Sequence, residues 1–139
     1  MIYIDTGAFL ARHLGQDQYH QQAIAFWDAI DKKRESCFTS NFVLDETFTL
    51  LGRRAGYTFA GERAENIYTS KLLSILRPTR NDEIKAIELF QKFAEHEVSF
   101  TDCISFVLMR RERIKRVFSF DTHFKWAGFK VCPSIGLNH

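Results

Sequence analysis

The chain has 139 residues, of which 45% are hydrophobic and 26% are charged, and its net charge is only +2. This composition is typical of one ordinary globular domain and excludes a disordered or low-complexity protein. The three cysteines are far apart and form no Cys-x-x-Cys or Cys/His cluster, which excludes a disulfide framework or a zinc site. We expect a cytoplasmic protein, because no secretory signal and no apolar run long enough to cross a membrane is present in the sequence.

The first part of the chain alternates short β-rich runs with helical patterns. Residues 2–4 form an apolar run, and Thr6 after it can cap a helix through about residue 14. In residues 18–33, apolar side chains recur at the i, i+3, i+4 and i+7 spacing of an amphipathic helix. A second short strand is expected at residues 37–39.

The same alternation continues toward the end of the chain. Ser40 or Asn41 is expected to cap a helix over residues 42–54, which ends at Gly56. The remaining expected elements are, in chain order, a helix at 58–70, a strand at 72–76, a helix capped by Asn81 or Asp82, a helix at 102–113, a strand at 117–120, a helical turn at 122–126 and an edge strand at 130–132.

Short strands that alternate with helices predict an α/β fold, namely a parallel sheet of four to five strands sandwiched by helices. We expect residues 1–139 to form this one domain. In such sheets, ligands bind outside the carboxyl ends of the strands. Asp5 and Asp121 each follow a predicted strand directly, so both are expected at that edge.

Four acidic residues stand where a folded chain directs a carboxylate inward, and they are Asp5, Glu46, Asp102 and Asp121. Glu46 lies within the apolar stripe of its predicted helix. At about 5 Å and an effective dielectric of about 20, each pair of like charges costs on the order of 3 kcal/mol. A divalent cation with hard oxygen ligands, Mg²⁺ or Mn²⁺, relieves this repulsion. The four acids therefore predict a metal-dependent nuclease.

Each acid also has a purely structural interpretation. Asp5 and Asp121 suit helix N-caps, and Asp102 fits a capping box with Ser99. Glu46 can instead form a buried salt bridge with an arginine. These four interpretations are independent of one another, whereas a metal site explains all four residues together.

Several other functions of an α/β domain lack their required residues. Gly7 stands where a haloacid dehalogenase has a second aspartate, and residues 6–8 lack the glycines and lysine of a phosphate-binding loop. A phospho-acceptor receiver domain needs an aspartate after the third strand, where this chain has Arg77, Pro78 and Thr79.

Basic residues gather in local clusters despite the low net charge. Arg53, Arg54, Arg110 and Arg111 are the candidates for a basic rim that binds RNA phosphates around an acidic centre. The alternative is that they lie on solvated helix faces. Among the many aromatic residues, Phe48, Tyr57, Phe59 and Tyr68 are placed where some can stay exposed and form a protein contact, although core packing is also open to each.

Four segments, in this order along the chain, resemble the PIN-domain ribonucleases, particularly the short VapC toxins of VapBC toxin–antitoxin systems. The segments are residues 2–6 (Ile-Tyr-Ile-Asp-Thr), 42–47 (Phe-Val-Leu-Asp-Glu-Thr), 99–106 (Ser-Phe-Thr-Asp-Cys-Ile-Ser-Phe) and 118–124 (Phe-Ser-Phe-Asp-Thr-His-Phe). The Ser-Phe-Thr-Asp and Asp-x-His-Phe pieces are the more specific ones.

The resemblance implies that Asp5, Glu46, Asp102 and Asp121 form the catalytic quartet. Asp5, Asp102 and Asp121 would bind Mg²⁺ or Mn²⁺, and Thr6 and Ser119 would be supporting hydroxyls. The resemblance further implies an RNA substrate, a small antitoxin as partner and a homodimer. Two alternatives stay open, a PIN-like binding module that does not cleave and a housekeeping RNA-processing nuclease. His123 is interpreted as a structural hydrogen-bonding residue of its turn in preference to a general acid.

Overall fold

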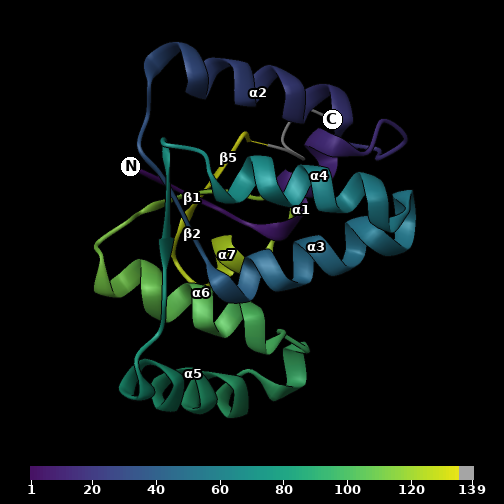
Figure 1. Cartoon of the computed structure of the whole chain (residues 1–139). Helices are drawn as coiled ribbons and strands as arrows, with labels where there is room; N and C mark the ends of the chain where they lie inside the picture. The colour runs from purple at the N-terminus through teal and green to yellow at the C-terminus, as the bar shows by residue number, and fades with distance from the viewer. Residues whose placement is uncertain (135–139) are drawn as a thin grey trace.

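A parallel five-stranded sheet forms the centre of the protein in this computed structural model, which describes residues 1–134 (Figure 1). The strands are β1 (Ile2–Ile4), β2 (Cys37–Ser40), β3 (Leu73–Leu76), β4 (Arg116–Phe118) and β5 (Lys130–Cys132). Their order across the sheet is β3-β2-β1-β4-β5, and every neighbouring pair is parallel. The predicted α/β fold is therefore confirmed. The prediction that the domain extends to residue 139 includes five residues outside the described part.

Helices cover both faces of this sheet, with α2 above the strands and α5 and α6 below them in the view of Figure 1. The helices are α1 (Thr6–His13), α2 (His20–Lys33), α3 (Asn41–Ala55), α4 (Tyr57–Tyr68), α5 (Arg80–Lys92), the 3₁₀ helix η1 (Ala94–His96), α6 (Phe100–Arg111) and α7 (His123–Trp126). Within the described residues, no helix is both long and apolar enough to cross a membrane.

The core lies where β1, β4 and α6 meet. All three residues of β1 are fully buried, as expected for a central parallel strand with both faces covered. Tyr3 extends toward α6, and its hydroxyl lies 2.8 Å from that of Ser105. Trp27 of α2 packs its ring against Phe118 of β4 at 5.1 Å between centroids. These contacts fix the strand ends that carry the acidic residues.

Several predicted helix starts differ from the structure; α6, for example, starts at Phe100, two residues before the predicted start at residue 102. Thr6 is the first residue of α1 and not its cap, because Asp5 occupies the N-cap position. The helix α5 is capped by Thr79, and not by Asn81 or Asp82, because a reciprocal capping box joins Thr79 to Asp82. Helix α2 starts at His20, two residues later than expected.

The fourth strand is shorter than predicted and ends at Phe118. Beyond Phe118 the Ser119 N–H still donates to the Cys132 carbonyl of β5 at 3.1 Å, and Phe120 then stacks on Tyr19, at 4.4 Å between parallel rings. Because the strand ends at Phe118, Asp121 lies three residues beyond it instead of directly at its end. The predicted edge strand at 130–132 matches β5.

Candidate active site

The four acids come from four separate elements and line one groove at the carboxyl edge of the sheet. Asp5 follows β1, Glu46 lies in α3, Asp102 is in the first turn of α6, and Asp121 follows β4. The groove that they share has a volume of about 640 Å³. Because the strands are parallel, their carboxyl ends meet at this edge, and the topology thus brings residues 116 positions apart into one site.

Ser119 joins the carboxylate of Asp5 to the backbone of Asp121. Its fully buried hydroxyl donates to Asp5 Oδ2 at 2.9 Å and accepts the Asp121 N–H at 3.0 Å. Asp5 itself is 5% exposed and also donates its N–H to the Phe118 carbonyl at 3.1 Å. The loop after β4 is thereby fixed in position against the end of β1.

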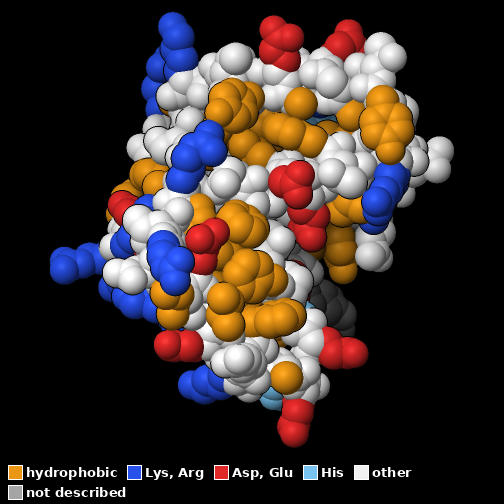
Figure 2. Space-filling model, turned by 60° about the horizontal axis from the view of Figure 1, so that its bottom comes forward, with side chains coloured by type: hydrophobic (Ala, Val, Ile, Leu, Met, Phe, Trp, Pro, Cys, Tyr) orange, Lys and Arg blue, Asp and Glu red, His pale blue; other side chains and the backbone are white. Residues whose placement is uncertain are grey.

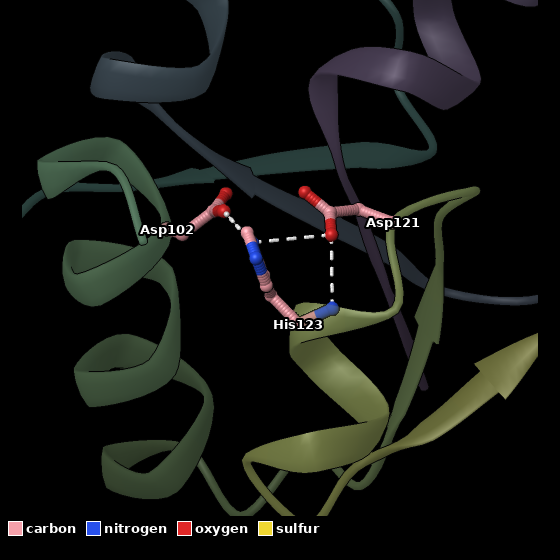
Figure 3. A group of neighbouring side chains, drawn as sticks. All are labelled: Asp102, Asp121 and His123. Carbon is pink, nitrogen blue, oxygen red and sulfur yellow. Dashed lines mark hydrogen bonds and ion pairs between the residues drawn. The ribbon is translucent and has the colours of Figure 1, made fainter. Parts of the chain in front are cut away.

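Asp102 takes part in the helix start only through its backbone. Its N–H donates to Ser99 Oγ at 3.0 Å, so Ser99 is the cap of α6 as predicted. The Asp102 carboxylate faces the groove, where Oδ2 lies 3.4 Å from His123 Nδ1 (Figure 3). Asp102 is 7% exposed and lines the groove, so its largely buried carboxylate can bind a ligand there.

Asp121 and His123 form the outer part of the site. Asp121 Oδ1 accepts the His123 N–H at 2.9 Å and lies 3.2 Å from His123 Nδ1. Figure 3 shows the imidazole of His123 between the carboxylates of Asp102 and Asp121. One ligand atom from each of these three residues lies within 4.8 Å of the other two, the closest grouping of this kind among the described residues.

Burial and mutual repulsion make two of the acids resist ionisation. Burial, and then the charge of Asp102, raises the pKa of Asp5 to about 8. Burial, followed by the charges of Asp121 and Glu46, raises the pKa of Asp102 to about 7. Carboxyl groups held this way favour a cation among them, because a positive charge stabilises their ionised forms.

The donor set fits a hard divalent cation. Carboxylate oxygens are the ligands that Mg²⁺ and Mn²⁺ prefer. In addition, Thr6 Oγ1 is buried at the same groove and has no hydrogen-bond partner within the described part of the chain. An unsatisfied buried hydroxyl is costly unless a ligand or water completes it. The chemistry of the residues thus supports a metal site.

The four arginines predicted to bind RNA lie in different places. Arg54 lines the acidic groove, and Arg53 beside it is exposed. Arg110 extends over the ring of Phe129. Arg111 forms a short ion pair with Asp82 of α5 and a second pair with Glu112 at 2.8 Å. The structure therefore brings only Arg54 of the four to the acids.

Other residues of the groove had no counterpart in the sequence interpretation. Asp17, Tyr19 and Glu97 line it from loops or a helix end, and no local pattern marked them. His123 had a signal in the Asp-x-His spacing, but its ring was interpreted as structural. Of the aromatic residues expected near the surface, Tyr57 and Tyr68 are exposed, whereas Phe48 and Phe59 are partly buried.

The fold and site define a class of α/β domain in which carboxylates converge at the carboxyl edge of a parallel sheet. The PIN domain family matches residues 2–130, and the chain belongs to this family.

Among curated relatives, the 23S rRNA-specific endonuclease VapC20 of Mycobacterium tuberculosis is 36% identical over 129 residues, 93% of this chain and 95% of that protein. A VapC ribonuclease of Archaeoglobus fulgidus is 31% identical over 138 residues, 98% of this chain and 83% of that one.

Solved structures show the same fold. The crystal structure of VapC20 from Mycobacterium tuberculosis, described as a Sarcin-Ricin loop cleaving toxin, superposes with a TM-score of 0.85 at 35% identity, over 93% of this chain and 96% of that one. The FitAcB structure from Neisseria gonorrhoeae reaches a TM-score of 0.68 at 17% identity, over 94% of this chain and 96% of that one, a likeness of fold alone.

Proposed function

We propose that this protein is a metal-dependent endoribonuclease that acts as the toxin of a toxin–antitoxin pair. The observation that carries the proposal is the convergence of Asp5, Glu46, Asp102 and Asp121 in one groove, with the pKa values of Asp5 and Asp102 raised. Relatives at 36% and 31% identity are named as an rRNA endonuclease and a ribonuclease. Ribosomal RNA is therefore the first substrate to test.

In this mechanism Asp5, Asp102 and Asp121 hold Mg²⁺ or Mn²⁺, and each residue has a defined task. When bound there, such an ion activates water and neutralises charge on the phosphate. Glu46, which also lines the groove, orients the attacking water. Ser119 keeps Asp5 in position through its 2.9 Å bond. Arg54 binds a substrate phosphate at the rim of the groove.

The direct test is a cleavage assay on ribosomal RNA with Mn²⁺ or Mg²⁺. We expect Asp102→Asn to lower the cleavage rate by at least about a hundredfold, because it removes one charge from the proposed metal site. Asp45→Asn is the matched control, since Asp45 is an exposed neighbour of Glu46 on α3 and lies outside the groove lining. Equal activity of Asp102→Asn and wild type would refute the proposal.

A binding module that does not cleave is the second candidate, and the same assay separates it. Such a module would bind RNA but give no cleavage with either metal in wild type. The presence of all four acids in one groove favours the nuclease.

A housekeeping nuclease differs from a toxin in its effect on the cell. Expression of a toxin arrests growth, and Asp102→Asn relieves the arrest.

A small antitoxin is the proposed protein partner. The groove is strongly acidic, with Arg54 as the arginine in its lining. The acidic side chains that line it are Asp5, Asp17, Glu46, Glu97, Asp102 and Asp121. A partner segment with a basic side chain has the complementary charge, and it would block the site by occupying it.

The proposed homodimer uses the outer face of α5. Ile84, Ile87 and Phe90 recur at a spacing of three residues and are 42%, 46% and 46% exposed. Hydrophobic side chains gather over this helix in the space-filling view (Figure 2). We expect Ile87→Glu to convert a dimer into a monomer in light scattering, whereas Ile24→Glu, at the similarly exposed Ile24 of α2, leaves the mass unchanged.

A further inference from the structure

We propose that His123 is a direct metal ligand through Nδ1, and that the site consequently prefers Mn²⁺ to Mg²⁺. This inference rests on the proposed metal-dependent function and names a ligand that the acidic quartet does not include. The ligand set closest in space is Asp102, Asp121 and His123, two carboxylates and one imidazole.

The distances in this set match adjacent corners of a metal coordination sphere. Nδ1 of His123 is 3.2 Å from Asp121 Oδ1 and 3.4 Å from Asp102 Oδ2. In an octahedral site with bonds of about 2.1 Å, neighbouring ligand atoms are about 3.0 Å apart. An ion between the three atoms therefore needs adjustments of only a few tenths of an ångström.

Hydrogen bonding alone does not explain this arrangement. Nδ1 carries at most one hydrogen, so it can make a full hydrogen bond to only one of the two carboxylates, or share a weaker three-centre bond between them. Charge-assisted N–H···O bonds are about 2.7–2.9 Å long, and both distances exceed that range. A nitrogen that faces two carboxylate oxygens at these distances is placed as a third ligand would be.

The imidazole is also held in position by the fold. The His123 N–H donates to Asp121 Oδ1 at 2.9 Å, which fixes the backbone of the turn. The next residue, Phe124, is fully buried and packs edge-on against Phe106 of α6 at 5.1 Å between centroids. This anchor joins the start of α7 to the helix that carries Asp102, so the three ligand atoms approach one another without large movement.

Imidazole nitrogen changes the choice of metal. Mg²⁺ prefers oxygen ligands and keeps much of its water, whereas Mn²⁺, although the weakest binder among the first-row divalent ions, accepts an imidazole nitrogen more readily than Mg²⁺ does. The groove already supplies carboxylates for either ion. A nitrogen from His123 therefore adds affinity for Mn²⁺ and little for Mg²⁺.

The test is pulsed electron paramagnetic resonance of Mn²⁺ bound to the purified protein. We expect ¹⁴N modulation from a directly bound nitrogen in wild type and none in His123→Asn. Loss of an outer-sphere partner alone weakens metal binding about 10–100-fold, so we expect the Mn²⁺ dissociation constant to rise at least about tenfold in His123→Asn. The Mg²⁺ dissociation constant should rise less than about threefold.

His96→Asn is the matched control. His96 lines the same hollow as His123, where its ring packs on Trp126 at 4.0 Å between centroids, but it does not belong to the ligand set. His96→Asn should keep both the modulation and the Mn²⁺ affinity. If His123→Asn does not fold, wild type with ¹⁵N-labelled histidine gives the answer, since ligation replaces the ¹⁴N signal by a ¹⁵N signal.

Two outcomes overturn the inference in different ways. Tight Mn²⁺ binding with no histidine nitrogen signal removes His123 from the ligand set and leaves the metal-dependent nuclease intact. Absence of both Mn²⁺ binding and cleavage in wild type refutes the proposed function, and the ligand assignment with it.

Discussion

Ser119 is the residue that connects the acids on the two central strands. Its hydroxyl bonds both the Asp5 carboxylate and the Asp121 N–H. Residues that orient metal ligands typically change metal affinity or activity about 10–100-fold when they are removed. We therefore expect the Ser119 hydroxyl to affect the activity of the site through the positions of Asp5 and Asp121.

We expect Ser119→Ala to lower cleavage about 10–100-fold and the free energy of unfolding by about 1–2 kcal/mol, since the Asp5 carboxylate and the Asp121 N–H both lose their hydrogen bond to this hydroxyl. Kinetic assays and chemical denaturation measure the two effects. Ser105→Ala is the control, because Ser105 is equally buried and bonds Tyr3 away from the groove lining. A similar loss of activity in both variants would show that Ser119 acts only through stability.

At the level of single residues, the sequence identified the acids but not their geometry. Glu46 was singled out because a carboxylate interrupts an apolar stripe, and it does line the groove. His123 was interpreted as structural because its spacing from Asp121 shows only that they share a turn. Which way the ring points depends on the packing of Phe124 against α6, a contact between distant segments that no local pattern contains.

Helix and strand types were predictable because their periodicity is local, whereas several ends were not. Thr79 caps α5 because its hydroxyl and Asp82 satisfy one another's backbone, and Asn81 and Asp82 were equally plausible caps by residue type alone. Strand β4 ends at Phe118, and Phe120 beyond it stacks on Tyr19, which is about a hundred residues away. The α5 cap is thus a local choice among neighbouring polar residues, whereas the segment after β4 makes a contact with a distant part of the chain, which no local pattern contains.

The predicted RNA-binding arginines on α6 and α3 have different surroundings in the structure. Arg111 of α6 joins that helix to α5 through Asp82, whose side chain is 7% exposed, and also bonds the Arg77 carbonyl at 3.3 Å. Burial acts to raise the pKa of Asp82, but the Thr79 hydrogen bonds and the nearby Arg111 guanidinium hold it below its usual range. Arg54 of α3 instead lines the groove.

We expect opposite effects from these two arginines. Arg111→Ala should lower the free energy of unfolding by about 1–2 kcal/mol, because it leaves a buried carboxylate without its cation, and should leave RNA binding unchanged. Arg54→Ala should weaken RNA binding and reduce its salt dependence by about one phosphate contact, with stability unchanged. Denaturation and fluorescence anisotropy at several salt concentrations measure both. Weaker RNA binding in Arg111→Ala would assign α6 to the RNA surface.

For the whole molecule, a net charge of +2 conceals a strongly uneven distribution. Acidic side chains from several elements gather in one groove, while most of the arginines lie elsewhere. Composition alone therefore gave no indication of nucleic-acid binding. The parallel topology could be predicted from the alternation of strands and helices, and with it the edge where Asp5 and Asp121 meet.

The concentration of buried acids gives the metal-free protein an unusual pH dependence. The pKa values of Asp5 and Asp102 are about 8 and 7 in the folded protein, above the value of about 3.9 in an unfolded chain. Between these values the folded state binds more protons than the unfolded state. Stability therefore falls as the pH rises from about 5 to 8, opposite to the usual behaviour of an acid in a salt bridge.

We expect the metal-free wild type to lose several kcal/mol of stability between pH 5 and pH 8, at most about 6 kcal/mol. Asp5→Asn should lose less and be the more stable protein at pH 8, because the amide removes a buried charge while its oxygen still accepts the Ser119 hydroxyl. Mn²⁺ at pH 8 should raise the melting temperature of wild type and scarcely that of Asp5→Asn. Calorimetry at several pH values measures all three effects. A wild type that grows more stable from pH 5 to pH 8 without metal would mean that the carboxylates do not repel one another, and the physical basis of the proposed metal site would be lost.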